Sequence, residues 1–194
     1  MESLWRSCRS KGDYSKLLTP VQSLLSRCVE FEEIEPYAGE AVKRPLAFRF
    51  DFIEVFGGAA TVTAHMAAKG FSVGCPIDLS RDPELDITKV HVLEWLLHLV
   101  TNRYVKAIMV EPPCTTFSIM RKPPLRSKLF PFGFDLMDPQ TRTGTLLGYR
   151  AFQILKAGAS CGITIILENP WSSMVKNLPP WDELLGHPEC ELVR

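Results

Sequence analysis

A cysteine and a glutamate each stand where a predicted strand ends, and a thiol beside a carboxyl group can carry out nucleophilic addition with proton transfer. Cys114 follows two prolines that end the apolar run 107–110. Proline cannot donate to a sheet ladder, so the backbone leaves the sheet and presents the thiol on a loop. Glu168 follows a second apolar run, 163–167, so we expect its carboxyl group to be partly buried. The alternatives are a structural cysteine and a glutamate that only anchors a loop.

A glycine turn followed by an acid points to a nucleoside-binding site. Gly57 and Gly58 lie between an apolar run and an alanine-rich segment, so the backbone can turn tightly there and the next helix offers N–H groups to a ligand. Asp78 ends the next apolar run, where a carboxylate can accept hydrogen bonds from ribose hydroxyls. A plain turn and a capping aspartate are the alternatives, and the order and spacing favour a nucleoside cofactor.

Basic residues follow the cysteine loop. Arg121, Lys122, Arg126 and Lys128 occur with no acid before Asp135, so this stretch could contact phosphates, and a solvated basic loop is the alternative. The whole chain has 22 basic and 22 acidic residues and a formal net charge of zero, so no overall field draws it to nucleic acid or membrane. Any contact with nucleic acid is therefore expected to be local.

Length and composition set the class of protein. The chain has 194 residues, of which 46% are hydrophobic and 23% charged, as is typical of one globular domain with a tail. Its six cysteines are widely spaced and form no zinc-type pairs, so we expect reduced thiols, no metal site and an intracellular protein. The start lacks a signal-peptide core and no apolar run approaches about 18 residues, so neither secretion nor a membrane span is expected.

Apolar runs alternate with helical patterns from about residue 46. We predict strands at 47–55, 71–77, 107–110 and 163–167, and helices at 59–69, 90–100 and 146–157. Such alternation, with polar or acidic residues after the strands, predicts an α/β fold with a doubly wound, mostly parallel sheet over residues 46–194. A loop rich in proline, glycine and arginine is expected from about 120 to 144.

The first 45 residues differ from this domain. Four basic residues share the first sixteen positions with polar ones, which indicates a partly disordered segment. Thr19 can cap one helix, because Pro20 takes the first helical position and apolar residues follow at helical spacing. Residues 1–45 are therefore predicted to form an N-terminal segment with a single helix.

Five short motifs follow one another along the predicted domain: Glu54-Val55-Phe56-x-Gly58, Asp78, Asp86-Ile87, Pro113-Cys114-x-x-Phe117-Ser118 and Glu168-Asn169-Pro170. Together they resemble the DNA cytosine-5 methyltransferase family, whose members are S-adenosylmethionine-dependent and Rossmann-like. The Pro-Cys-x-x-Phe-Ser and Glu-Asn motifs are the specific part, since the others fit many methyltransferases. The resemblance covers about residues 46–175.

This resemblance implies a chemistry and a cofactor. Cys114 would add to carbon 6 of a cytosine while Glu168 hydrogen-bonds or protonates ring nitrogen 3, and carbon 5 would take a methyl group from S-adenosylmethionine. The base would be flipped out of the nucleic acid, DNA in preference to RNA, and a nuclear location would follow from a DNA substrate. The resemblance assigns cofactor binding to Phe56, Gly57, Gly58, Asp78, Asp86, Ile87 and Pro113. It assigns substrate binding to Ser118, Arg121, Lys122 and Asn169.

The chain also departs from the family pattern. Ala60 and Thr61 stand where the family has further glycines, and Thr115 replaces a glutamine. About eight residues separate Asp78 from Asp86, too few for a helix and a strand, so one edge strand is expected to be missing. The family continues past this C-terminus with an arginine-bearing strand and a target-recognition domain. We therefore expect an incomplete domain, a fragment or degenerate copy whose target recognition comes from a partner chain or a further domain.

Three functions stay open at this point. The first is a cytosine methyltransferase, and the second is a methyltransferase with another substrate. The third is a catalytically silent Rossmann-like module that binds cofactor or nucleic acid.

Overall fold

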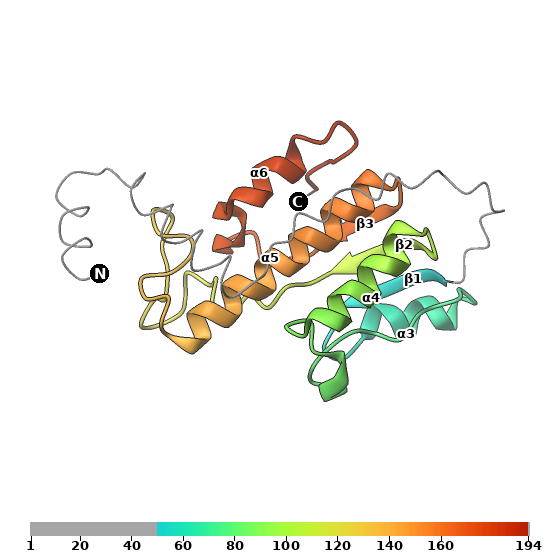
Figure 1. Cartoon of the computed structure of the whole chain (residues 1–194), viewed down its shortest axis with the longest axis horizontal. Coiled ribbons are helices and arrows are strands. Elements are labelled where there is room, and N and C mark those ends of the chain that lie inside the picture. Colours follow the sequence, from blue (N-terminus) through green and yellow to red (C-terminus); the bar gives the residue numbers. More distant parts are fainter. Residues whose placement is uncertain (1–49, 194) are drawn as a thin grey trace. The chain divides into compact units, whose positions relative to one another are not determined.

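The computed structural model describes residues 50–193 (Figure 1). The chain divides into two units, Met1–Arg44 and Pro45–Arg194, and the described residues belong to the second. The helix predicted after Thr19 and residues 47–49 of the first predicted strand lie outside the described part.

A three-stranded parallel sheet forms the centre of the domain. In order across the sheet, the strands are β1 (Phe50–Val55), β2 (Val105–Val110) and β3 (Thr164–Leu167). The register pairs Val55 with Val110 and Val110 with Leu167. The strands therefore end side by side, so the glycine turn, Glu111 and Glu168 all follow at one edge of the sheet.

The segment predicted as a strand at 71–77 is not a continuous strand. It pairs with the outer side of β1 at two isolated parallel bridges, through Val73 and Ile77. Pro76 interrupts it, since proline has no N–H group to donate to the neighbouring strand. The bridge at Ile77 still brings Asp78 to the edge where the three strands end.

Helices cover both faces of the sheet. They are α3 (Thr61–Ala68), α4 (Val90–Thr101), α5 (Pro139–Ser160) and α6 (Pro179–Leu185). Side chains alternate between the faces of a strand, so Glu54, which bonds Thr63 of α3, points away from the face of Val55. Ile165 shares the face of Val55 through the register, and α5 packs so closely on it that a Cβ at Gly158 would overlap Ile165. Helices α3 and α5 therefore lie on opposite faces.

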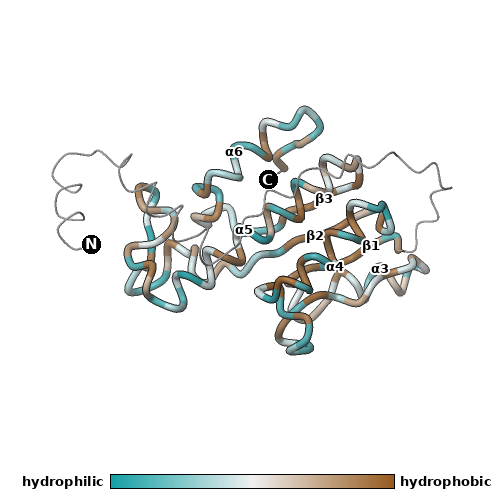
Figure 2. Tube along the Cα trace, viewed as in Figure 1, coloured by the Kyte–Doolittle hydropathy of each residue, from teal (hydrophilic) through white to brown (hydrophobic). Residues whose placement is uncertain are grey.

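The core lies between the sheet and the helices α4 and α5, which also pack against each other. Figure 2 shows the apolar residues concentrated in the strands and in α4. Helix α6 packs on α5, with the rings of Phe152 and Trp181 edge to face at 6.4 Å. No other described strand pairs with the outer side of β3, where Ile166 is 42% exposed. Among residues 50–193, no helix has the length and hydropathy needed to cross a membrane.

Helix α5 begins at Pro139, earlier than the predicted start at 146, and so shortens the predicted loop. The carboxylate of Asp138 accepts hydrogen bonds from the N–H and the hydroxyl of Thr141, both at 2.7 Å, which caps the helix. Gly144, which had suggested a loop, lies inside α5 because the helix passes close to the cysteine loop. A Cβ at Gly144 would overlap the side chain of Thr116.

The central strand should carry more of the stability than the edge strand. Ile108 of β2 is fully buried, whereas Ile166 of β3 is 42% exposed. Replacing Ile108 with Ala should lower the free energy of unfolding by about 2–5 kcal/mol, and the matched change Ile166→Ala by less than about 1 kcal/mol. Urea unfolding followed by circular dichroism measures both. Equal losses would contradict the placement of β2 at the centre.

Candidate active site

Four carboxylates gather where the strands end: Glu54, Asp78, Glu111 and Glu168. Burial raises the pKa of Glu111, and repulsion from the other three carboxylates raises it further. Its buried Oε1 has no hydrogen-bond partner among the residues that the structure describes. Sequence reasoning gave Glu111 no role, although it follows a predicted strand as Asp78 and Glu168 do. Residues 50–193 contain no group of three or more His, Cys, Asp or Glu side chains arranged to hold a metal ion.

The glycine turn after β1 packs against a buried side chain on one side and borders open space on the other. Glu54 is buried and accepts hydrogen bonds from the N–H and the hydroxyl of Thr63 at 2.7 and 2.5 Å. A Cβ at Gly57 would overlap the Glu54 side chain, so glycine is required there. Gly58 has a φ of +50°, and nothing lies within 4 Å of where its Cβ would be. Phe56 also has a positive φ, 64°, a strained conformation of the kind found at functional sites.

Asp78 holds the glycine turn in place. Its Oδ2 accepts a hydrogen bond from the Gly58 N–H at 2.9 Å, and its Oδ1 accepts from the N–H and the hydroxyl of Ser80 at 2.7 and 2.6 Å. Burial raises the pKa of Asp78, but these hydrogen bonds outweigh burial and the pKa lies below its usual value. The carboxylate predicted to contact a ribose is thus ionised and already engaged on both oxygens.

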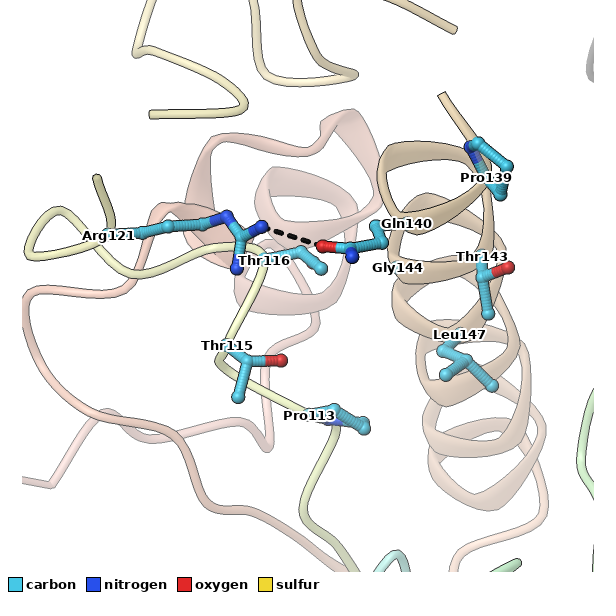
Figure 3. A pocket seen from close by; sticks show the side chains of 9 residues that line it. All are labelled: Pro113, Thr115, Thr116, Arg121, Pro139, Gln140, Thr143, Gly144 and Leu147. Atoms are coloured by element: carbon cyan, nitrogen blue, oxygen red, sulfur yellow. Dashed lines mark hydrogen bonds between the residues drawn. The ribbon is translucent and has the colours of Figure 1, made fainter. Parts of the chain in front are cut away.

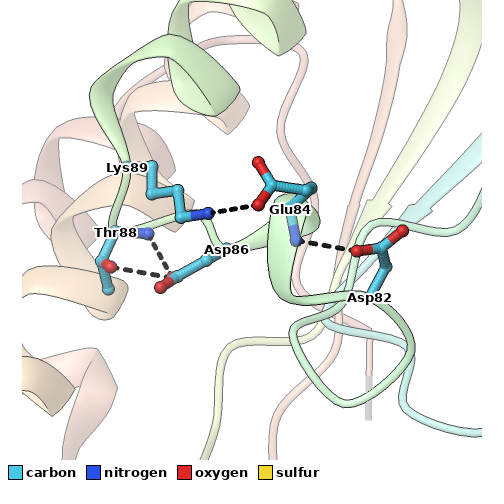
Figure 4. A network of polar contacts seen from close by, with 5 residues as sticks. All are labelled: Asp82, Glu84, Asp86, Thr88 and Lys89. Carbon is cyan, nitrogen blue, oxygen red and sulfur yellow. Dashed lines mark hydrogen bonds and ion pairs between the residues drawn. The ribbon is translucent and has the colours of Figure 1, made fainter.

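Asp86 and Ile87 lie just before α4, and Figure 4 shows Asp86 among the polar contacts there. Asp86 Oδ1 accepts hydrogen bonds from the N–H and the hydroxyl of Thr88, both at 2.8 Å. Ile87 is 2% exposed and belongs to the core. The described residues 78–89 hold a short 3-10 helix, Pro83–Leu85, and no strand, which agrees with the edge strand expected to be missing.

Hydrogen bonds connect the end of β3 to the end of β2 and to the start of the cysteine loop. The side-chain amide of Asn169 donates to the carbonyl oxygen of Pro112 at 2.7 Å, and the N–H of Glu168 donates to the carbonyl oxygen of Val110 at 3.1 Å. Cys114 is a half-buried free thiol. Glu168 is exposed, so the partial burial expected for it is wrong. The two segments that bear these side chains therefore lie side by side.

Arg126 anchors the cysteine loop from inside the protein. It is 1% exposed and its guanidinium lies 3.9 Å from the centre of the Phe117 ring. Its N–H groups donate to the carbonyl oxygens of Thr116, Pro131 and Thr141 and to the hydroxyls of Thr116 and Thr145. Burial lowers its pKa to about 10, which leaves it charged at neutral pH. The interpretation of Arg126 as part of a phosphate-contacting stretch is therefore wrong for this residue.

The other basic and polar residues predicted to bind substrate lie near the surface. Arg121 is half-buried and donates through Nη2 to Gln140 Oε1 at 2.6 Å. Arg121 also lines a pocket of about 380 Å³ between the cysteine loop and α5 (Figure 3). Lys122 is exposed. The hydroxyl of Ser118 accepts a hydrogen bond from the Met120 N–H at 3.1 Å.

The raised pKa of Glu111 predicts a stability gain when its charge is removed. Because the folded state disfavours ionised Glu111, wild-type stability falls as pH rises through the ordinary glutamate pKa, about 4.3, toward the raised value. Glu111→Gln should therefore raise the midpoint of thermal unfolding at pH 7 and leave it unchanged below about pH 4. The exposed Glu189 offers a control, since Glu189→Gln should change little at either pH. A gain of equal size at both pH values would speak against repulsion as its cause.

Loss of Arg126 should loosen the cysteine loop. Arg126→Met keeps a long side chain but leaves buried carbonyl oxygens unpaired, so the free energy of unfolding should fall by about 2–4 kcal/mol. The matched change Lys128→Met, at an exposed position of the same loop, should cost less than about 0.5 kcal/mol. Limited proteolysis should cut residues 118–137 faster only in the Arg126 variant. Equal cleavage of both variants would rule out the anchoring role.

Comparisons with known proteins found no relative of this chain. No protein-family model, no curated protein and no solved structure matches the chain. The resemblance to cytosine-5 methyltransferases therefore rests on the sequence motifs alone.

Proposed function

We propose that this chain is an S-adenosylmethionine-dependent methyltransferase domain that acts on cytosine in nucleic acid, DNA in preference to RNA. The hydrogen bond between Asn169 and Pro112 is the observation that carries the proposal. It joins the Glu-Asn motif to Pro112, the residue directly before the Pro-Cys motif; these two motifs are the specific elements of the resemblance. Because these motifs meet at one edge of a parallel sheet, a thiol and a carboxyl group can act on the same base.

The order of the strands supports the doubly wound sheet that this function uses. From β1 the chain goes to the segment 71–77 on one side of β1, and it returns through α4 to β2 on the other side. The direction of winding thus reverses at β1. Ligands of open α/β sheets bind beyond the C-terminal ends of the strands at such a reversal, which is the position of Gly57 and Gly58.

The residues around the glycine turn fit a cofactor that carries positive charge. The space above Gly58 is open, and the four carboxylates at the strand ends make this edge negative. S-adenosylmethionine has a sulfonium and an amino group, which such an edge attracts. The buried Oε1 of Glu111 has no hydrogen-bond partner in the described part of the chain, so a donor on the cofactor would satisfy it.

Cys114 and Glu168 divide the proposed chemistry. The sulfur of Cys114 bonds to carbon 6 of the cytosine, and the electron pair of the 5,6 double bond moves toward carbon 5. Glu168 is exposed and so within reach of an incoming base; in its protonated form it donates a hydrogen bond to ring nitrogen 3 and offsets the negative charge that develops there. When bound, S-adenosylmethionine supplies the methyl group for carbon 5. Loss of the carbon-5 proton to a base then restores the double bond and releases Cys114.

A catalytically silent module with the same fold is the second candidate. Asp78 uses both carboxylate oxygens within the chain, and Asp86 bonds Thr88. The side chain of Ile87 is buried in the core. These contacts leave fewer side-chain groups for the ribose and adenine of a cofactor, which favours a domain that has lost catalysis.

Covalent trapping should separate the two candidates. A DNA oligonucleotide containing 5-fluorocytosine should form a denaturant-resistant adduct with the protein in the presence of S-adenosylmethionine. A base can remove the carbon-5 proton of cytosine but cannot remove fluorine from this position, so the bond between Cys114 and carbon 6 persists. Cys114→Ser should abolish the adduct, and the matched change Cys161→Ser, at another half-buried free thiol, should keep it. Mass spectrometry of the protein measures all three.

Calorimetry with S-adenosylmethionine completes this test. If the wild-type protein binds the cofactor but forms no adduct, the silent module is the candidate function that remains. Neither binding nor an adduct would overturn the proposed function. Methyl transfer that survives Cys114→Ser would point to a substrate other than cytosine.

A further inference from the structure

The pocket beside the cysteine loop is an open hollow lined by two elements (Figure 3). Pro113 and Thr115, the sequence neighbours of Cys114, line one wall, and Thr143 and Leu147 of α5 line the other. Its volume of about 380 Å³ lies within the range of small-molecule sites. A ligand in this pocket would thus contact the segment that carries the proposed nucleophile, although Cys114 itself does not line the pocket.

One end of the pocket favours an anion. Arg121 lies there, held by its bond to Gln140, and its buried Nε has no hydrogen-bond partner among residues 50–193. None of the lining residues is acidic. The pKa of the nearby Asp138 is lowered by its hydrogen bonds with Thr141 and, to a smaller degree, by the charge of Arg121. The carboxylate of Asp138, however, is used to cap α5. A guanidinium with an unused N–H and no lining carboxylate is suited to a phosphate group.

The other end of the pocket is apolar. Figure 3 shows Pro113 and Leu147 away from the end where Arg121 meets Gln140. A ligand with an anionic group at one end and a ring at the other matches this distribution. A nucleotide within a strand has this form, since each phosphate is followed by a sugar and a base.

We infer that this pocket binds one nucleotide of the substrate strand, the one next to the reacting cytosine. Arg121 and Gln140 bond its phosphate, and its sugar and base lie against Pro113 and Leu147. The inference rests on the proposed function and goes beyond it by giving the strand a second point of attachment. A second attachment fixes the direction in which the strand passes Cys114.

The walls of the pocket are set before the ligand arrives. Arg126 bonds both the carbonyl oxygen and the hydroxyl of Thr116. Gly144 lets α5 approach Thr116 so closely that a Cβ would overlap it. Gln140 orients Arg121. A site ordered in this way loses little conformational entropy when it binds.

A matched pair of charge-removing variants tests the inference. Binding of a fluorescein-labelled single-stranded DNA oligonucleotide with 5-fluorocytosine at its centre is measured by anisotropy over a range of salt concentrations. Arg121→Gln should weaken binding about tenfold and reduce the salt slope by about one. Arg142→Gln removes the same charge from an exposed position of α5 outside the pocket and should weaken binding less than about twofold. Equal losses would overturn the inference, since diffuse charge would then explain binding.

A pocket-filling variant gives a second test that does not alter charge. Thr143 is exposed, so Thr143→Trp fills the pocket without entering the core and should weaken binding about fivefold or more, whereas Ser160→Trp, at an exposed position of α5 outside the pocket, should not. Unchanged binding by Thr143→Trp would also overturn the inference. Thermal unfolding of each variant checks its fold.

The covalent adduct is scored on the same samples, so failures can be told apart. An adduct at Cys114 with no difference between the Arg121 and Arg142 variants would leave the proposed function standing and the pocket inference wrong. A difference between these variants without an adduct would support the pocket and leave the methyltransferase proposal wrong.

Discussion

The buried charge of Arg126 is the constraint on which the rest of the site depends. A guanidinium taken out of water is costly unless its N–H groups are bonded, and every described hydrogen bond of Arg126 goes to a neutral oxygen of the loop or of α5. Only a loop conformation that supplies these oxygens together keeps the arginine inside. The backbone after Cys114, the wall of the pocket and the first turns of α5 are therefore fixed as one unit.

Opposite charges lie on the two sides of the cysteine loop. The strand ends carry carboxylates that repel one another, as the raised pKa of Glu111 reflects. The pocket along α5 carries Arg121 and no lining acid. A cationic cofactor and an anionic strand would be drawn to different sides of Cys114, although the chain as a whole has no net charge. This separation favours two ligands bound at once around a single thiol.

The sequence predicts the sheet better than it predicts the site. Strands β1, β2 and β3 are apolar runs bounded by turn residues, and such runs depend little on the rest of the fold. The start of α5 was missed because Gly144 indicated a loop, although Asp138 and Pro139 form a capping signal. The role of Arg126 could not be predicted, since burial of a basic residue depends on oxygens brought together from distant parts of the chain. Glu111 could have been found, because it follows a strand as Asp78 does.

β3 is an edge strand of the described sheet, and its unpaired edge affects how molecules of this protein meet in solution. Its outer N–H and C=O groups have no described strand to pair with, and Ile166 beside them is exposed. Such an edge is a template for strands of other molecules, and natural sheets protect their edges with lysine or proline. A charge placed beside this edge, as in Ile166→Lys, should therefore reduce association between molecules in concentrated solutions.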